Sequence, residues 1–309
     1  DYYLFKQHKV TNMKKSFILG LLLGGVSLLN AATLDECIAA YKAGALEKAE
    51  TLCTKATKEN PKSYDANFFL MRTNYAIGNY KKALPYAQKL EQLSTSLDDY
   101  SLSYNFLGVI YSKLGDKKQE LNYSLKNLEI NKKQGNRNNI GISLSNLGSY
   151  YMKINNLEEA QKYFLEALEY ITDKSEIANT YNSLAVLYSN LNNQEKELEY
   201  AKKAVISAKE ASDFGKYSFY LSTLASAYIS NQNYDLAKSS LFEALQIAQD
   251  KGLLTQQSYA LKYLGVLSKR QDDKENARKY YNQALQISKS QGNVSEIEDI
   301  TFLLNKLEK

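Results

Sequence analysis

Apolar and small residues recur along the chain at spacings of three and four, which is typical of one buried face on an α-helix. The motif Leu-Gly-x-x-Tyr begins at Leu107 and Leu147, and it returns with alanine in place of glycine at Leu184 and Leu224. At Leu264 it continues with a serine in place of the tyrosine. These leucines are 40, 37, 40 and 40 residues apart, so the chain has a structural period.

A second segment follows the motif in most units. It carries a small residue, an apolar residue four positions on and a small residue three further, as in Ala160, Phe164 and Ala167, or Ala277, Tyr281 and Ala284. A glycine or alanine on the first helix that faces an alanine on the second lets the two helices pack closely. Each unit is therefore predicted to be a helix pair. Asn155-Asn156 and Asn192-Asn193 are predicted turns, because asparagine tolerates the left-handed conformation.

Earlier units follow a shorter period, with Ala49 and Ala83 34 residues apart. In this pattern the sequence resembles the tetratricopeptide repeat family, whose unit is a helix pair of 34 residues, and the later units resemble its longer variety. The resemblance implies an all-α fold, a right-handed α-solenoid of about seven helix-turn-helix repeats with a C-terminal capping helix. The predicted units are residues 33–62, 63–99, 100–138, 139–174, 175–215, 216–255 and 256–292, and the capping helix is 293–309.

A few residues depart from the repeat pattern. Glu120 and Glu197 stand where the second helix usually has its first alanine, and Asn127 and Leu90 replace the later one. Looser packing is expected in the second, third and fifth units.

The N-terminal region has the pattern of a signal peptide at residues 13–31. Met13 is the first methionine, Lys14 and Lys15 supply positive charge, and an apolar run of about 13 residues leads to Ala31 and Ala32. That run is shorter than the roughly 20 residues that span a bilayer, so retention as an anchor is the weaker alternative. Residues 1–12 are expected to be a non-native upstream extension. The mature chain is predicted to begin near Ala32 or Thr33 and to be periplasmic or secreted.

The charge of the chain gives no reason to expect a nucleic-acid partner. Removing the residues before Ala32 takes away four of the 39 basic and one of the 34 acidic residues, which leaves a net charge of +2. Nucleic-acid-binding domains normally show a basic patch or stripe.

Residues for catalysis are largely missing. The single histidine, His8, precedes the predicted start, so the mature chain lacks the usual general base and the commonest metal ligand. Phosphate-binding loops and CxxC motifs are also absent from the sequence. Carboxylates such as Glu158 and Glu159 fall on polar helix faces, where charged side chains are common and need no catalytic role. The sequence therefore predicts a protein that is not an enzyme and uses no cofactor and no metal.

Two cysteines, Cys37 and Cys53, fall on inward faces of the first helix pair. They are either two small buried hydrophobic residues or a disulfide, which antiparallel packing and export would permit.

The family implies that the first helices line a concave surface that binds peptides or partner proteins. The segment NSLAVLY, residues 182–188, resembles the corresponding helix of the kinesin light chain type of repeat. The predicted groove residues, chosen from the face next to the packing residues, are Asn105, Val109, Ser145, Ser149, Asn182, Val186, Ser222, Ser226, Lys262, Lys269 and Arg270. The amides of Asn105 and Asn182 are expected to bond to a peptide backbone. Lys262, Lys269 and Arg270 are expected to receive an acidic group. The alternative is that these residues form an ordinary solvent-exposed surface that binds no ligand.

These features favour a non-catalytic, exported scaffold or adaptor that binds a protein or an extended peptide in its groove. It is not predicted to be a stable transmembrane protein. An alternative is a peptide- or ligand-sensing regulatory module that acts through a partner, although such regulators usually carry a DNA-binding domain and no leader.

Overall fold

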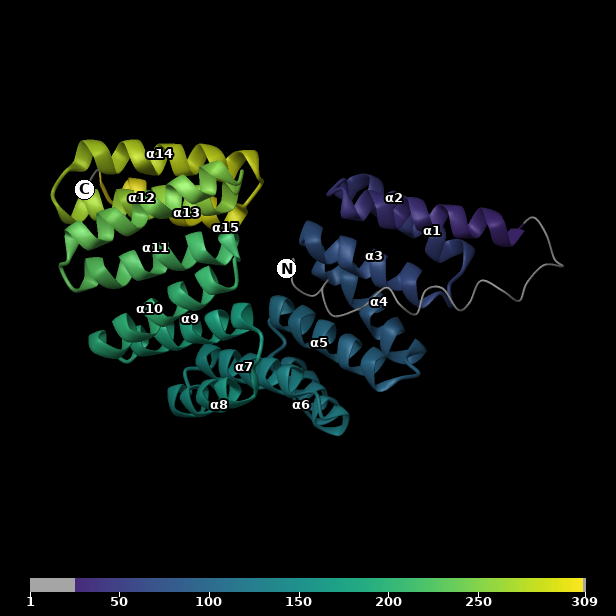
Figure 1. Cartoon of the computed structure of the whole chain (residues 1–309). Helices are drawn as coiled ribbons and strands as arrows, with labels where there is room; N and C mark the ends of the chain where they lie inside the picture. The colour runs from purple at the N-terminus through teal and green to yellow at the C-terminus, as the bar shows by residue number, and fades with distance from the viewer. Residues whose placement is uncertain (1–25, 308–309) are drawn as a thin grey trace. The chain divides into compact units, whose positions relative to one another are not determined.

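The chain, described by a computed structural model over residues 26–307, consists of helices joined by short turns (Figure 1). Over this range there are fifteen helices and no strand. Their bounds are α1 Val26–Lys42, α2 Leu46–Glu59, α3 Tyr64–Ile77, α4 Tyr80–Leu93, α5 Leu97–Leu114, α6 Lys117–Gln134, α7 Arg137–Lys153, α8 Leu157–Tyr170, α9 Lys174–Asn190, α10 Gln194–Glu210, α11 Phe214–Ser230, α12 Tyr234–Asp250, α13 Leu254–Arg270, α14 Lys274–Ser290 and α15 Val294–Asn305.

In chain order the first fourteen helices make seven helix-turn-helix units, from α1–α2 to α13–α14. The last helix, α15, packs on α14. The predicted fold class, an all-α solenoid of helix-turn-helix repeats with a C-terminal capping helix, is confirmed. The first helix starts earlier than expected, at Val26 inside the predicted signal peptide 13–31. Residues 1–25 lie outside the described residues, so the upstream extension and the cleavage of the leader stay predictions.

The turns within the pairs use left-handed residues, as the Asn-Asn dipeptides predicted. Asn155 has a φ of 61° and Asn192 a φ of 54°. The next residue then starts the second helix, because the side chain of Asn156 accepts a hydrogen bond from the N–H of Glu159 at 3.3 Å. The later turns place Gln232 and Asp272 in the same conformation, with φ of 59° and 58°.

The chain divides into two compact units, residues 1–120 and 121–309. In the first, α3 packs on both α1 and α2. In the second, the first helices of the pairs lie side by side, α7 with α9, α9 with α11 and α11 with α13. This row of first helices presents one continuous face, which we call the first-helix face.

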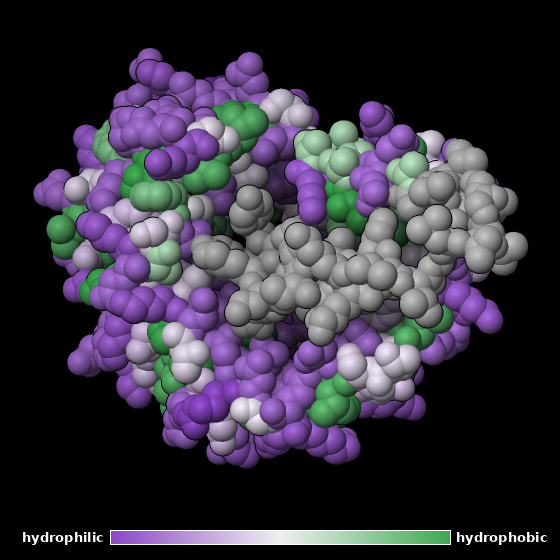
Figure 2. All heavy atoms as spheres, turned by 45° about the vertical axis from the view of Figure 1, so that its right-hand side comes forward, coloured by the Kyte–Doolittle hydropathy of each residue, from purple (hydrophilic) through white to green (hydrophobic). Residues whose placement is uncertain are grey.

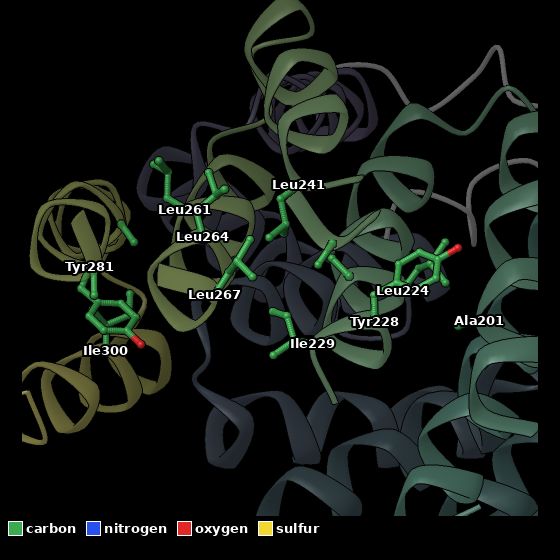
Figure 3. Packing of buried hydrophobic residues seen from close by; sticks show 14 of the residues in the cluster. Ala201, Leu224, Tyr228, Ile229, Leu241, Leu261, Leu264, Leu267, Tyr281 and Ile300 are labelled. Carbon is green, nitrogen blue, oxygen red and sulfur yellow. The ribbon is translucent and has the colours of Figure 1, made fainter. Parts of the chain in front are cut away.

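Small residues allow the close packing within the pairs. The phenyl ring of Phe164 lies over Gly148, and the ring of Tyr281 lies over Gly265, so that a Cβ atom at either glycine would come within 2.7 Å and 2.5 Å of those rings. In the second compact unit, leucines of α11, α12 and α13 fill the space between pairs, and Ile300 of α15 extends this core over Tyr281 (Figure 3).

The polar residues that depart from the repeat pattern are buried and form hydrogen bonds. Glu197 is buried, and burial raises the pKa of its carboxyl despite a bond to Ser189. Asn127 accepts a hydrogen bond of 2.6 Å from Asn131 Nδ2, which also donates to Ser143 Oγ at 2.8 Å. The third and fourth pairs are thus joined by a buried polar network in place of an alanine contact.

Replacing Gly141 by alanine is expected to lower the free energy of unfolding by about 1–3 kcal/mol, although alanine is the better helix former by about 1 kcal/mol. The new Cβ would lie 2.8 Å from the backbone nitrogen of Ile171 and 2.9 Å from the carbonyl oxygen of Ala167, and backbone atoms cannot move aside as a flexible side chain can. Urea denaturation of the purified variant measures the effect.

Gly215 supplies the matched control, because the nearest atoms to its missing Cβ lie 3.6 Å away. Gly215→Ala should raise the free energy of unfolding by about 0.4–1 kcal/mol. If Gly141→Ala were stabilising to the same degree, the close approach of α7 and α8 would not constrain the fold.

None of the helices over residues 26–307 combines the length and the apolar character that crossing a membrane requires.

Candidate functional site

The first-helix face of the second compact unit holds most of the predicted groove residues, at the positions two before and two after the repeat leucine. Ser145 is buried and its Oγ accepts a hydrogen bond of 3.3 Å from Thr180 Oγ1 of the next first helix. Ser149 is half-buried and donates to the carbonyl oxygen of Ser145 at 3.1 Å. Val186 is exposed, and Ser226 is half-buried. These positions share a face, but they differ in how much side chain they offer a ligand.

Asn182 has one end of its side-chain amide unbonded on this face. Its residue is half-buried, yet its Oδ1 atom is covered and receives no hydrogen bond. A covered acceptor without a donor costs about 1–3 kcal/mol relative to a bonded one. The carbonyl end of the amide would therefore lose no hydrogen bond in the protein if the side chain turned toward a ligand.

Ser222 corrects one prediction. Its side chain is completely buried, and its Oγ donates to the carbonyl oxygen of Ser218 at 3.3 Å. A serine at this position is small enough to be covered completely. Ser222 is therefore a packing residue and does not line an open surface.

Lys262 corrects a second prediction, because its charge is already paired. Its Nζ atom lies 2.8 Å from Asp299 Oδ2 and 3.0 Å from Glu296 Oε1, both on α15. The second contact is an ion pair without hydrogen-bond alignment, since Glu296 Oε1 has no donor in bonding geometry. The ammonium also lies 4.7 Å from the centre of the Tyr259 ring. The capping helix thus occupies the place where an acidic group of a partner was expected.

The other two predicted basic residues differ from each other. Lys269 Nζ donates to the carbonyl oxygen of Lys306 at 3.4 Å, whereas Arg270 is exposed. In the first compact unit, described by itself, Asn105 and Val109 are half-buried on α5. Of the three predicted basic groove residues, only Arg270 extends into solvent.

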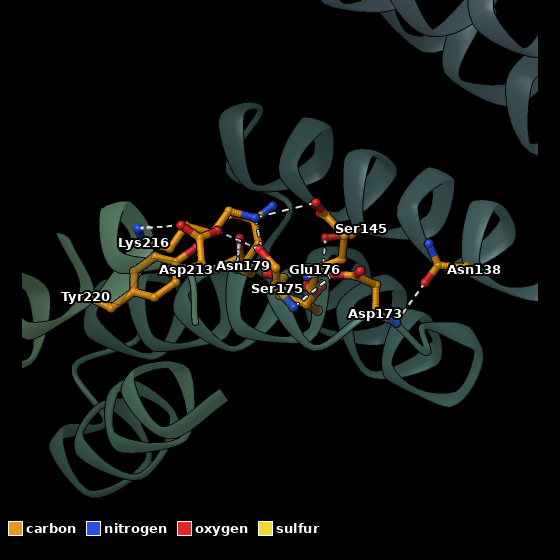
Figure 4. Close-up of polar contacts among 11 residues, drawn as sticks. Asn138, Ser145, Asp173, Ser175, Glu176, Asn179, Asp213, Lys216 and Tyr220 are labelled. Carbon is orange, nitrogen blue, oxygen red and sulfur yellow. Dashed lines mark hydrogen bonds and ion pairs between the residues drawn. The ribbon is translucent and has the colours of Figure 1, made fainter. Parts of the chain in front are cut away.

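A network of polar side chains joins the beginnings of α9 and α11, and the sequence pattern missed it (Figure 4). Ser175 Oγ donates to Asp213 Oδ2 at 2.8 Å, and Lys216 Nζ donates to the carbonyl oxygen of Ser175 at 3.1 Å. Deeper along the same helices, Tyr220 donates to Asn179 Oδ1 at 3.4 Å. Burial is the main cause that raises the pKa of Tyr220, and the nearby carboxylates raise it further. This phenol therefore keeps its proton and stays a hydrogen-bond donor. The network fixes the spacing of the first helices.

The two cysteines lie together in the first helix pair. Cys37 and Cys53 are both buried and are joined as a disulfide, with their Cα atoms 4.9 Å apart. Oxidation of the pair in the cell stays a prediction.

Among residues 26–307 there is no group of three histidine, cysteine, aspartate or glutamate side chains that could hold a metal ion. On the face of the molecule seen in Figure 2, hydrophilic residues predominate and hydrophobic ones form small separate groups. The single histidine, His8, lies outside the described residues.

Similar solved structures share the fold at low identity. The apo form of RapI is 16% identical over 85% of this chain and 99% of its own, with a TM-score of 0.65. A tetratricopeptide repeat protein from Parabacteroides merdae is 16% identical over 91% of this chain and 99% of its own, with a TM-score of 0.60. A Rap protein complexed with competence and sporulation factor is 13% identical over 91% and 98% of the two chains, with a TM-score of 0.57.

No curated protein matches the sequence. Models of the tetratricopeptide repeat, however, match residues 34–97, 102–134, 139–209, 220–251 and 264–291, which together are most of the chain. These matches fall on the helix pairs described above. The chain therefore belongs to the tetratricopeptide repeat family.

Proposed function

We propose that the chain is a non-catalytic, exported adaptor that holds an extended peptide, or an extended segment of a partner protein, on a concave surface formed by its first helices. Membership of the family makes it a scaffold for protein interaction, and the partner is a protein or peptide. Export is supported by the leader pattern at residues 13–31.

The observation that carries this proposal is the unbonded Oδ1 of Asn182 beside the exposed side chain of Val186. An extended peptide presents alternating backbone N–H and C=O groups, and one amide side chain can bond to both. The valine, one helical turn on, supplies an apolar contact for a side chain of the peptide. Asn105 occupies the equivalent position of the third helix pair, in the other compact unit.

Asn182→Ala is expected to weaken peptide binding between a few-fold and about tenfold, because a neutral hydrogen bond contributes about 0.5–1.5 kcal/mol. Peptides selected from a phage-displayed library of random sequences serve as ligands, and calorimetric titration gives the affinity. The Asn182→Ala/Val186→Ala double variant should lose more, because it also removes the apolar contact.

Glu158→Ala is the control, because this exposed residue lies on α8, a second helix. Its affinity should equal that of the unchanged protein. If the double variant kept full affinity with its circular dichroism unaltered, binding would have to lie on the second helices or the loops.

A sensing role is the second candidate, favoured by the likeness to Rap structures, one of which holds competence and sporulation factor. Here the peptide would act as a signal, and a separate partner would read the change. Capture of a protein from the cell envelope that depends on bound peptide would favour the sensor, whereas capture that peptide blocks would favour the adaptor.

A further inference from the structure

One edge of the second compact unit carries a row of exposed apolar side chains. The first residues of α11, α13 and α15 are Phe214, Leu254 and Val294, and their side chains are 45%, 45% and 65% exposed. The equivalent residues of α7 and α9 are Arg137 and Lys174, so a charged side chain suits the position equally well. Nothing in the packing of a helix pair therefore requires these three residues to be apolar.

The three residues lie along one continuous edge. Gln256 of α13 lies beside Gly215 of α11, since its Nε2 atom would be 3.6 Å from a Cβ at that glycine. Thr255 Oγ1 donates to Gln291 Oε1 at 3.3 Å, which holds the start of α13 next to the residues that precede α15. Adjacent first turns thus bring Phe214, Leu254 and Val294 into one row, which we call the apolar edge.

Lysines accompany the apolar edge. Lys209, Lys251 and Lys289 are exposed at the ends of α10, α12 and α14, each three to five residues before one of the apolar residues. Lys251 Nζ lies 4.4 Å from the centre of the Phe214 ring.

The carboxylates nearest in sequence to these lysines are occupied. Glu210 pairs with Lys174 at 2.7 Å, and Asp250 accepts a hydrogen bond from Gln246 at 2.8 Å. Among the residues that the structure describes, no carboxylate lies within ion-pair distance of the three lysines. The edge therefore combines apolar tips with unneutralised positive charge.

We propose that the apolar edge binds the surface of an anionic lipid bilayer. The apolar side chains would enter the boundary between headgroups and acyl chains, while the lysines contact lipid phosphates. The long aliphatic part of a lysine side chain lets its ammonium group reach phosphates at different depths. A protein partner fits less well, because three side chains on a narrow edge fall far short of the roughly 1,000 Å² that a stable protein interface buries. This inference does not rest on the proposed peptide binding.

Sedimentation with lipid vesicles tests the proposal on the full chain. The protein should co-sediment with vesicles of phosphatidylglycerol and phosphatidylcholine at low salt. The co-sedimenting fraction should fall as salt rises or when phosphatidylglycerol is left out. Phe214→Ser/Leu254→Ser/Val294→Ser should reduce partitioning by about thirtyfold or more, since half-exposed apolar side chains lose their transfer from water. Lys209→Glu/Lys251→Glu/Lys289→Glu should remove the dependence on phosphatidylglycerol.

The control is Leu236→Ser/Phe242→Ser, which removes two exposed apolar side chains from the outer face of α12 and should leave partitioning unchanged. Circular dichroism confirms that each variant is folded. Equal partitioning of the Phe214, Leu254 and Val294 triple variant and the unchanged protein would overturn the proposal. So would a concentration-dependent dimer in light scattering that the same triple variant abolishes, because a second copy would then cover the edge.

Discussion

Lys262→Ala is expected to lower the free energy of unfolding by about 3–5 kcal/mol. The side chain is buried between α13 and α15, where its ammonium contacts Asp299 and Glu296 at 2.8 Å and 3.0 Å. Glu296 is itself buried. Removing the lysine therefore leaves a carboxylate out of water without its counter-charge, and the capping helix loses its strongest polar contact with the last helix pair.

Urea denaturation followed by circular dichroism measures the loss. Lys262→Met/Glu296→Leu should recover most of it, because an apolar pair of similar volume needs no counter-charge. Lys174→Ala is the control, since its ion pair with Glu210 is exposed on both sides and should contribute at most about 1 kcal/mol. A loss at Lys262 no greater than that at Lys174 would show that α15 is held by its apolar face alone.

The pH dependence of the Lys262 effect has a definite sign. Burial alone lowers the pKa of this lysine, but its contacts with Asp299 and Glu296 outweigh burial and raise the pKa above the ordinary value of 10.5. A raised pKa for a base means that the stabilisation is fully present below pH 10.5 and is lost as the pH rises through the folded-state value. The difference between the unchanged protein and Lys262→Ala should hence stay constant from about pH 7 to 9.

Removing the disulfide is expected to cost about 3 kcal/mol in the chain-entropy account, because Cys37 and Cys53 are separated by 16 residues. Cys37→Ser/Cys53→Ser should unfold at lower urea than the oxidised protein. Dithiothreitol should lower the stability of the unchanged protein and leave that of the double variant as it was. Equal stability of the oxidised and reduced proteins would mean that the first helix pair does not need the link.

Peptide mapping of the protein isolated from the cell envelope tests oxidation and export in one experiment. Without reductant, the peptides that contain Cys37 and Cys53 should run as one linked species, and the N-terminal peptide should begin near Ala32 or Thr33. A chain that retains Met13 and is found in the cytosol contradicts export. Two free thiols in envelope protein contradict the disulfide.

The helix pairs could be predicted from the sequence because close packing restricts the residues at few positions. Gly148 and Gly265 are small since Phe164 and Tyr281 lie over them, and that restriction recurs with the period. The turns follow from local chemistry in the same way, since Asn155 adopts the left-handed conformation at low cost.

The depth of a side chain on the first-helix face could not be predicted from its position in the repeat. Ser222 and Lys262 stand at the same place relative to the motif as Asn182, yet the first two are buried and the third is half-buried. For Lys262, Glu296 and Asp299 of α15 contact the ammonium. Burial on this face thus depends on contacts with other helices as well as on the position within the repeat.

The polar network of Figure 4 follows the period of the repeat. Ser175 and Asp213 are 38 residues apart, Glu176 and Lys216 are 40 apart, and Asn179 and Tyr220 are 41 apart. Each pair is separated by about one period. An alignment of neighbouring repeats that places their small residues in register therefore also places these polar partners at nearly the same position.

The disulfide and the buried ion pair lie in the first and in the last helix pair that the structure describes. Each inner helix pair has a neighbour on both sides, whereas an end pair has one, so end repeats fray first and their amides exchange fastest with solvent. Here a covalent link closes the first pair, and a buried ion pair fastens α15 to the last. Both contacts oppose fraying of these two pairs, so hydrogen exchange in them should become faster when the disulfide is reduced or Lys262 is replaced.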